Sequence, residues 1–152
     1  AKRYALGVSD PRMASLMIEV LANLGAESAF VFYGEDGLDE LTTTGPSFIY
    51  RLRRGEITHA EFTPEDFGVE RARLEDLLGG DAAENMAITR AILDGESGPK
   101  RDIALVNAAP AIVAAGLADG FTGAMELAIA SVDTGNAKTV LEKAVAFSGR
   151  SS

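Results

Sequence analysis

The spacing of apolar positions changes twice along the 152-residue chain, from helical to strand-like and back to helical. Between Asp10 and Gly25 the apolar residues recur at intervals of three and four, which is typical of one buried helix face. Asp10 offers an N-cap oxygen, Pro11 suits the first helical position, and Gly25 can adopt the left-handed conformation that ends a helix. The sequence therefore predicts a helix over about residues 11–24. Its apolar face consists of Met13, Leu16, Met17, Val20, Leu21 and Leu24.

Strand-like spacing follows this helix. Residues 28–33 are apolar at consecutive positions, which predicts a strand buried on both faces. Residues 48–52 and 57–62 resemble two further strands, and the Gly-containing connection Arg54-Gly55-Glu56 between them favours an antiparallel hairpin. Alternation of helix and strand is typical of an α/β layer architecture.

The second half of the chain is predicted to be mostly helical. Residues 69–78 resemble a brief helix that ends at Gly79-Gly80, and the capping-box spacing from Asp81 to Glu84 opens another. A long Ala-rich helix is expected over about residues 99–115, bent near Pro110, where a backbone N–H is missing. Two more helices are expected at about 121–134 and 136–147, and no repeat or interdomain linker separates any of these elements.

Composition and charge narrow the function classes. Hydrophobic residues make up 47% and charged residues 24%, which are values of a globular domain. The net charge of −9 argues against a nucleic-acid partner and against an anionic membrane surface. The chain has no cysteine, which excludes a disulfide framework and thiolate chemistry and fits a cytoplasmic location.

No secretory signal is visible in the given sequence. Ala1-Lys2-Arg3 is basic, but no continuous apolar stretch follows it. The most apolar stretch, residues 103–118, contains Asn107 and Pro110 and is short for a membrane span, so we interpret it as a buried helix. The start at Ala1 is consistent with removal of a methionine or with a piece of a longer protein.

The strongest chemical signal is an acidic loop that follows the first predicted strand. Gly34 ends the strand, and four carboxylates follow by Glu40. Asp39 and Glu40 are adjacent and repel each other unless they share a cation or a donor, so the pair is a candidate Mg²⁺ site beside Thr42-Thr43-Thr44-Gly45. Ligands tend to gather at such strand ends in α/β sheets. On spacing alone, a solvated acidic turn remains the alternative.

Other candidate sites are weaker. His59, the single histidine, belongs to no recognisable hydrolase motif, and a partly exposed strand histidine is the simpler interpretation. Gly79-Gly80-Asp81 lacks the longer glycine pattern of a phosphate-binding loop, so a helix C-cap followed by an N-cap is favoured. Two small basic clusters resemble ordinary surface charge: Arg51, Arg53 and Arg54, and Lys100 with Arg101.

The acidic loop, written V-x-x-G-x-D-G-L-D-E over residues 31–40, resembles the acidic motif of the anthranilate phosphoribosyltransferase family. Further stretches agree with that family in the same order along nearly the whole chain. The resemblance covers the C-terminal part of the family's sequence, somewhat under half. The agreeing stretches are Leu24-Gly25-Ala26, Thr63 to Gly68, Gly79-Gly80-Asp81 with Glu84-Asn85, and Leu93-Asp94-Gly95 through Gly98 to Asp102 and Asn107-Ala108-Ala109.

This resemblance implies a fold. Residues 1–152 are expected to form the C-terminal part of the α/β catalytic domain of nucleoside phosphorylases and phosphoribosyltransferases, with a mixed sheet, an antiparallel hairpin and flanking helices. The family's N-terminal helical domain, through which it usually forms homodimers, and the first part of its α/β domain would then be missing. A severed domain exposes apolar surface, so self-association is expected.

The resemblance also implies an activity, the transfer of phosphoribosyl from phosphoribosyl pyrophosphate to anthranilate in tryptophan biosynthesis. In the family an Asp-Glu pair carries Mg²⁺ against the pyrophosphate, and this role falls on Asp39 and Glu40. The family's G-T-G-G-D loop, its K-H-G-N-R stretch, its Asn-Pro motif and its anthranilate-holding arginine have no counterpart in this chain. We therefore assign no catalytic residue and expect the isolated chain to be inactive.

Two alternatives remain open. One is a relative of the same fold, either similar to pyrimidine nucleoside phosphorylases or a paralogous phosphoribosyltransferase acting on another aromatic amine. The other is a module that keeps the fold and binds a metal or a partner without chemistry. Upstream sequence separates the first, because acceptor recognition lies there in the family, and a Mg²⁺ titration separates the second.

Overall fold

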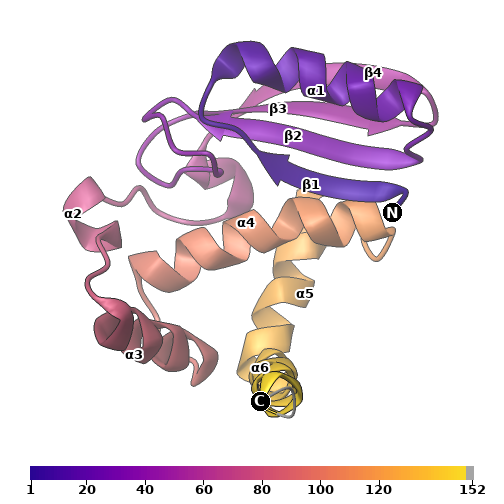
Figure 1. The fold of residues 1–152 in the computed structure, drawn as a ribbon. Coiled ribbons are helices and arrows are strands. Elements are labelled where there is room, and N and C mark those ends of the chain that lie inside the picture. Colours follow the sequence, from indigo (N-terminus) through magenta and orange to yellow (C-terminus); the bar gives the residue numbers. More distant parts are fainter. Residues whose placement is uncertain (150–152) are drawn as a thin grey trace.

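The computed structural model describes residues 1–149, and its centre is a four-stranded mixed sheet (Figure 1). The first two strands are parallel, and the remaining pairs are antiparallel. This arrangement confirms the predicted α/β class, the mixed sheet and the hairpin. The strands lie side by side in chain order: β1 (Arg3–Gly7), β2 (Ser28–Gly34), β3 (Ser47–Arg53) and β4 (Glu56–Phe62).

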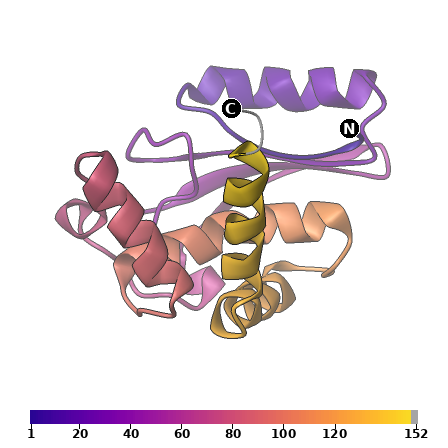
Figure 2. The ribbon, with the colours of Figure 1, turned by 60° about the horizontal axis from the view of Figure 1, so that its bottom comes forward.

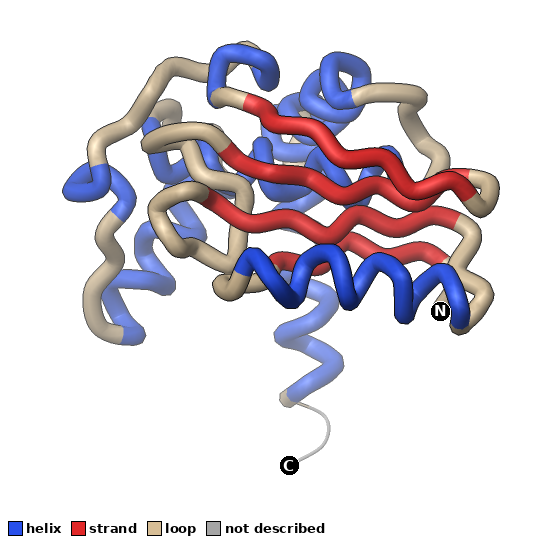
Figure 3. The backbone as a smooth tube through the Cα atoms, turned by 90° about the horizontal axis from the view of Figure 1, so that it is seen from above, coloured by secondary structure: helices blue, strands red, loops and turns tan. Residues whose placement is uncertain are grey.

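Helices cover both faces of the sheet. Helix α1 (Pro11–Asn23) lies across one face, and α4 (Pro99–Ala115) lies across the other, where the first residue of α5 (Phe121–Asp133) also packs on Phe30 (Figures 1 and 3). The side chains of β2 alternate between two cores: Val31 packs among buried residues of α1, whereas Phe30 and Phe32 pack among buried residues of α4 and α5. This double coverage explains why β2 is apolar at consecutive positions.

The β3–β4 hairpin turns through Arg54 and Gly55. Both residues have positive φ, 53° and 82°, and the flanking residues Arg53 and Glu56 pair directly. A two-residue turn with two left-handed positions matches the twist of antiparallel strands, and glycine takes one of those positions without steric cost. The turn fixes the register that places β4 at the edge of the sheet.

The prediction of a helix over residues 69–78 is mostly wrong. Instead of a helix over residues 69–78, the structure has a 3₁₀ turn at Pro64–Phe67 and a single helical turn, α2 (Leu74–Leu77). The N–H of Ala72 donates to the carbonyl of Thr43 at 2.9 Å, and the N–H of Arg73 donates to the carboxylate of Asp76 at 3.2 Å. The Ala72 N–H thus bonds to the acidic loop rather than to a carbonyl one helical turn earlier, and the Arg73 N–H is capped by Asp76, so no helix forms before Leu74.

The remaining helices agree with the predicted ranges to within one or two residues. They are α3 (Ala82–Leu93) and α6 (Asn136–Ser148) beside α4 and α5. Helix α4 continues through Pro110, which is buried, and it packs against the sheet, as expected for a buried helix. Helix α6 packs against α5 and α3 rather than against the sheet (Figure 2). Within residues 1–149, no helix is long and apolar enough to cross a membrane.

A candidate metal site in the acidic loop

The acidic loop, residues 35–46, joins β2 to β3 beyond the carboxyl ends of β1 and β2, at the left of the sheet in Figure 1. Its backbone lies directly on the end of β1. A Cβ atom built on Gly7 would overlap the carbonyl oxygen of Asp39, so glycine is required there for the two backbones to approach. The loop is therefore placed at the edge of the sheet where α/β proteins usually bind ligands.

Asp36 holds the loop together. Its carboxylate accepts hydrogen bonds from the hydroxyls of Thr42 at 2.5 Å and Thr44 at 2.8 Å, and from the N–H of Leu38 at 3.2 Å. Thr42 and Thr43 are buried. The hydroxyls of Thr42 and Thr44 are thus used inside the loop, and Asp36 stabilises its conformation.

Asp39 and Glu40 are in a different situation. Both are exposed, and neither carboxylate has a hydrogen bond or ion pair to any residue within 1–149. Partial burial raises the pKa of Glu40, and the negative charge of Asp39 raises it further. Within residues 1–149 the pair thus presents free carboxylate oxygens and negative charge on the same loop in which Asp36 is engaged by three hydrogen bonds.

The carboxylate oxygens of Asp39 and Glu40 are suitable ligands for Mg²⁺, but they supply only part of its coordination shell. Mg²⁺ prefers oxygen ligands and commonly takes one or two carboxylates together with water and phosphate oxygens. In the described part of the chain, no group of three or more Asp, Glu, His or Cys side chains could hold a metal on its own. Asp39 and Glu40 would therefore hold an ion only together with water, a phosphate-bearing ligand or groups from elsewhere.

A residue of α4, Asn107, holds the loop through hydrogen bonds to its backbone. The side-chain amide of Asn107 accepts a hydrogen bond from the N–H of Leu41 and donates one to its carbonyl oxygen, both at 2.8 Å. Leu41 is fully buried, and its backbone follows directly on Glu40. Sequence patterns predicted no role for Asn107 beyond its place in a stretch that agrees with the family. The available signal was an amide side chain in the otherwise apolar residues 103–115 of α4, because a partly buried amide needs partners.

The glycine pair before α3 does not form an anion site. The N–H of Gly80 donates to Asn85 Oδ1 at 3.0 Å, and the N–H of Asp81 donates to Glu84 Oε2 at 3.0 Å. Asp81 in turn accepts from the N–H of Glu84 at 2.9 Å. These backbone donors are already occupied by side chains of the helix they precede, which confirms the capping interpretation.

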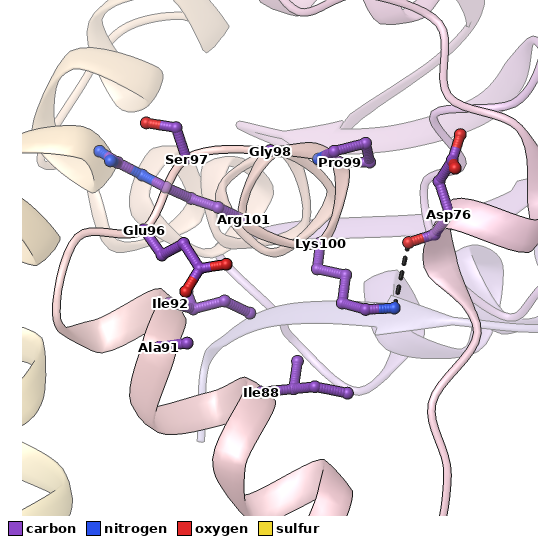
Figure 4. A pocket seen from close by; sticks show the side chains of 10 residues that line it. All are labelled: Asp76, Ile88, Ala91, Ile92, Glu96, Ser97, Gly98, Pro99, Lys100 and Arg101. Atoms are coloured by element: carbon purple, nitrogen blue, oxygen red, sulfur yellow. Dashed lines mark hydrogen bonds between the residues drawn. The ribbon is translucent and has the colours of Figure 1, made fainter.

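The cluster of Lys100 and Arg101 is also engaged within the fold. Both residues line a cavity of about 290 Å³ at the start of α4 (Figure 4). The ammonium of Lys100 extends toward Asp76 and donates to its carbonyl at 3.1 Å, while Arg101 extends away from it and pairs with Asp133 at 2.6 Å. Since their charged groups bind other parts of the chain, neither residue offers this cavity a free cation to receive a phosphate.

The second basic cluster and His59 lie on the β3–β4 hairpin. The guanidinium of Arg51 lies 5.4 Å from the centre of the Phe30 ring, and Arg53 pairs with Asp119 at 3.5 Å. His59 lies on the exposed edge strand and stacks on Tyr50 at 4.3 Å. His59 is therefore the exposed strand histidine that the sequence suggested.

With this geometry established, similarity to known proteins identifies the class. Residues 1–138 match the model of the glycosyl transferase family, α/β domain, and the chain belongs to that family. Among curated relatives, the chain is 49% identical over 142 residues to anthranilate phosphoribosyltransferase of Moorella thermoacetica and 48% identical over 145 residues to that of Parvibaculum lavamentivorans. These matches cover 93% and 95% of the chain but only 42% of each relative.

Solved structures agree. Anthranilate phosphoribosyltransferase from Thermus thermophilus superposes with a TM-score of 0.87 at 37% identity, over 97% of this chain and 43% of that one. The Saccharomyces cerevisiae enzyme in complex with PRPP and Mg superposes with a TM-score of 0.81 at 24% identity, a likeness that concerns the fold alone.

The chain therefore spans about two fifths of the length of these relatives. The expectation that this share is the C-terminal part of the family's sequence is not supported by the matches.

Proposed function

We propose that this chain supplies the metal-binding, leaving-group side of a Mg²⁺-dependent phosphoribosyl transfer from phosphoribosyl pyrophosphate to anthranilate. The observation that carries the proposal is the free Asp39–Glu40 pair on a loop anchored at the carboxyl ends of two parallel strands. The similarity to anthranilate phosphoribosyltransferases supports the choice of these substrates. The proposal places the reaction in tryptophan biosynthesis and, with no cysteine in the chain, in the cytoplasm.

In this reaction the bond between the ribosyl carbon and pyrophosphate breaks, and the amine of anthranilate forms the new bond to that carbon. Mg²⁺, when bound, neutralises charge on the departing pyrophosphate. Asp39 and Glu40 hold that charge-neutralising site in place, and Asp36 keeps the loop closed through Thr42 and Thr44. No nucleophilic side chain of this chain is required.

The proposal assigns the rest of the active site to segments outside these 152 residues. In line with the resemblance, we infer that the pyrophosphate-cradling glycine loop, the groups that recognise anthranilate and a helical dimerisation domain lie in such segments. We therefore expect the isolated chain to bind Mg²⁺ weakly and to catalyse no transfer. Turnover of anthranilate by the purified chain would overturn this expectation.

A Mg²⁺ titration of the isolated chain, followed through its backbone amide NMR signals, tests the metal site. Millimolar Mg²⁺ is expected to shift signals between Gly34 and Thr44, and Asp39→Asn or Glu40→Gln is expected to abolish those shifts. Glu35→Gln is the matched control, because it removes the same charge from an exposed position of the same loop. Loss of binding in all three variants, or no response in the unmodified chain, would contradict the assignment.

Self-association of the isolated chain is a second part of the proposal. Helix α6 exposes large apolar side chains that no described element covers: Val140 is 65% exposed, Val145 62% and Phe147 75%. Apolar groups gathered on one helix in this way favour contact with another protein surface. Sedimentation over a range of concentrations tests this, and a monomer at the highest concentration would count against it.

A further inference from the structure

The two carboxylates of the proposed metal site are neighbours in the chain, so their relative direction depends on the backbone that carries them. Two contacts fix that backbone. On one side, the carbonyl oxygen of Asp39 rests on Gly7, where no side chain would fit. On the other side, Leu41 is held through both of its backbone polar groups by Asn107. Asp39 and Glu40 lie between these two anchors.

The anchor at Asn107 is itself fixed. Its amide nitrogen also donates to the carbonyl of Ile103, one turn earlier in α4, at 3.0 Å. Helix α4 packs against β1 and β2, the same strands whose ends support the loop. The amide of Asn107 therefore connects the loop to a helix that cannot shift independently of the sheet.

From this arrangement we infer that Asn107 is a positioning residue for the Asp39–Glu40 pair. It does not reach the metal itself. By holding both polar groups of Leu41, it fixes the direction in which the Glu40 side chain leaves the backbone and keeps both carboxylates facing one ion. This inference rests on the proposed function, because it assumes that the pair binds a cation. Side chains that orient metal ligands in this indirect way strongly affect affinity.

The chain contains a matched case in which the same geometry serves another purpose. Asn85 accepts from the N–H of Gly80 at 3.0 Å and donates to its carbonyl at 2.9 Å. There the neighbouring acids, Asp81 and Glu84, are occupied as helix caps. Loss of the Asn85 amide therefore removes the same pair of hydrogen bonds without touching free carboxylates.

The experiment measures Mg²⁺ affinity of the 152-residue chain by NMR for the unmodified protein, Asn107→Leu and Asn85→Leu, with Mg²⁺ alone as the probe. Asn107→Leu is expected to weaken Mg²⁺ binding by about 10- to 100-fold. Asn85→Leu is expected to leave the affinity unchanged. Unmodified affinity in Asn107→Leu, or equal weakening in both variants, would overturn the inference.

If Asn107→Leu does not fold, Asn107→Asp tests the positioning role instead. Aspartate keeps an acceptor for the Leu41 N–H and loses the amide nitrogen that donates to the carbonyls of Leu41 and Ile103. Because the substitution adds negative charge, any weakening of Mg²⁺ binding cannot come from charge and would support a positioning role. Affinity equal to or tighter than that of the unmodified chain would overturn it.

A second readout separates this inference from the proposed function. Backbone ¹⁵N relaxation reports the order of residues 39–41 in the absence of metal. If the unmodified chain binds no Mg²⁺, the metal assignment fails, and relaxation still tests the anchor. Greater mobility of residues 39–41 in Asn107→Leu alone supports anchoring by Asn107. Unchanged order in that variant overturns it.

Discussion

In two loops of this protein an asparagine side chain makes the same pair of backbone hydrogen bonds, but the acidic side chains nearby differ in whether they have partners. In the acidic loop and in the turn at Gly79–Asp81, a helix asparagine binds the N–H and the carbonyl of one loop residue. At Gly80 the nearby acids are occupied by backbone N–H groups. In the acidic loop, Asp39 and Glu40 have no such partners in the part of the chain that the structure describes.

This difference separates a structural turn from a candidate site. A capping carboxylate lowers the free energy of the fold because it satisfies helix N–H groups that would otherwise lack partners. Two adjacent carboxylates without partners raise it, since their negative charges repel each other. A rigidly anchored backbone that carries unsatisfied charge is therefore better evidence for ligand binding than acidic composition, which both loops share.

The largest expected effect comes from Gly7→Ala. The new Cβ would meet the backbone of Asp39, so β1 and the acidic loop must separate, and we expect a loss of about 3 kcal/mol in the free energy of unfolding. Gly80→Ala is the control, because its Cβ meets the Glu84 side chain rather than backbone, and the Glu84 carboxylate can turn away at the loss of its hydrogen bond from the N–H of Asp81. Chemical denaturation measures both, and equal losses would show that the close approach at Gly7 is relaxed in solution.

Removal of the two asparagines is expected to have unequal effects on stability. Asn107→Leu leaves the N–H and carbonyl of buried Leu41 without partners, at a cost of about 2–3 kcal/mol. Asn85→Leu is expected to cost less than about 1 kcal/mol, because water can replace the amide at the exposed Gly80. Thermal unfolding compares the two variants. A larger loss for Asn85→Leu would reverse the comparison.

A cap substitution should affect one loop only. Asp81→Ala removes the oxygen that accepts from the N–H groups of Ala83 and Glu84, and it is expected to cost about 1 kcal/mol. The Mg²⁺ response of residues 34–44 is expected to stay unchanged. If that response weakened together with stability, the two loops would not be independent.

The smallest effect on stability is expected for Glu40→Gln in metal-free solution. Partial burial and Asp39 raise the pKa of Glu40, so its ionised form destabilises the fold at pH values above that pKa. The variant is therefore expected to be slightly more stable than the unmodified chain at neutral pH. The gain should disappear as the pH falls below the ordinary pKa of glutamate. A variant less stable at neutral pH would indicate an unrecognised partner for Glu40.

Much of the fold follows from local patterns. The Asp10 cap, the Gly25 stop and the apolar spacing between them predict α1, and the Gly55 turn predicts the hairpin. The extended course of residues 69–73 could not be predicted, because it depends on a hydrogen bond between Ala72 and Thr43, which are distant in the chain.

In the candidate site, too, the features that could be predicted from the sequence are the local ones. Asp39 and Glu40 are visible in the sequence because adjacent acids after a strand are a local pattern. The roles of Gly7 and Asn107 are not visible, since each contacts the loop across more than thirty residues. The threonines illustrate the opposite case: the sequence placed them beside the candidate metal site, but Asp36 accepts hydrogen bonds from the hydroxyls of Thr42 and Thr44 within the loop.

The contact between Gly7 and Asp39 has a practical consequence for protein engineering. Strand β1 begins at Arg3, so an affinity tag or fusion partner attached at Ala1 pulls on a strand whose other end supports the acidic loop. A tag attached beyond α6 pulls on a helix that packs against α5 and α3 and not against the sheet. Biosensors or immobilised forms of this domain should therefore be tethered through the carboxyl terminus if the loop is to keep its geometry.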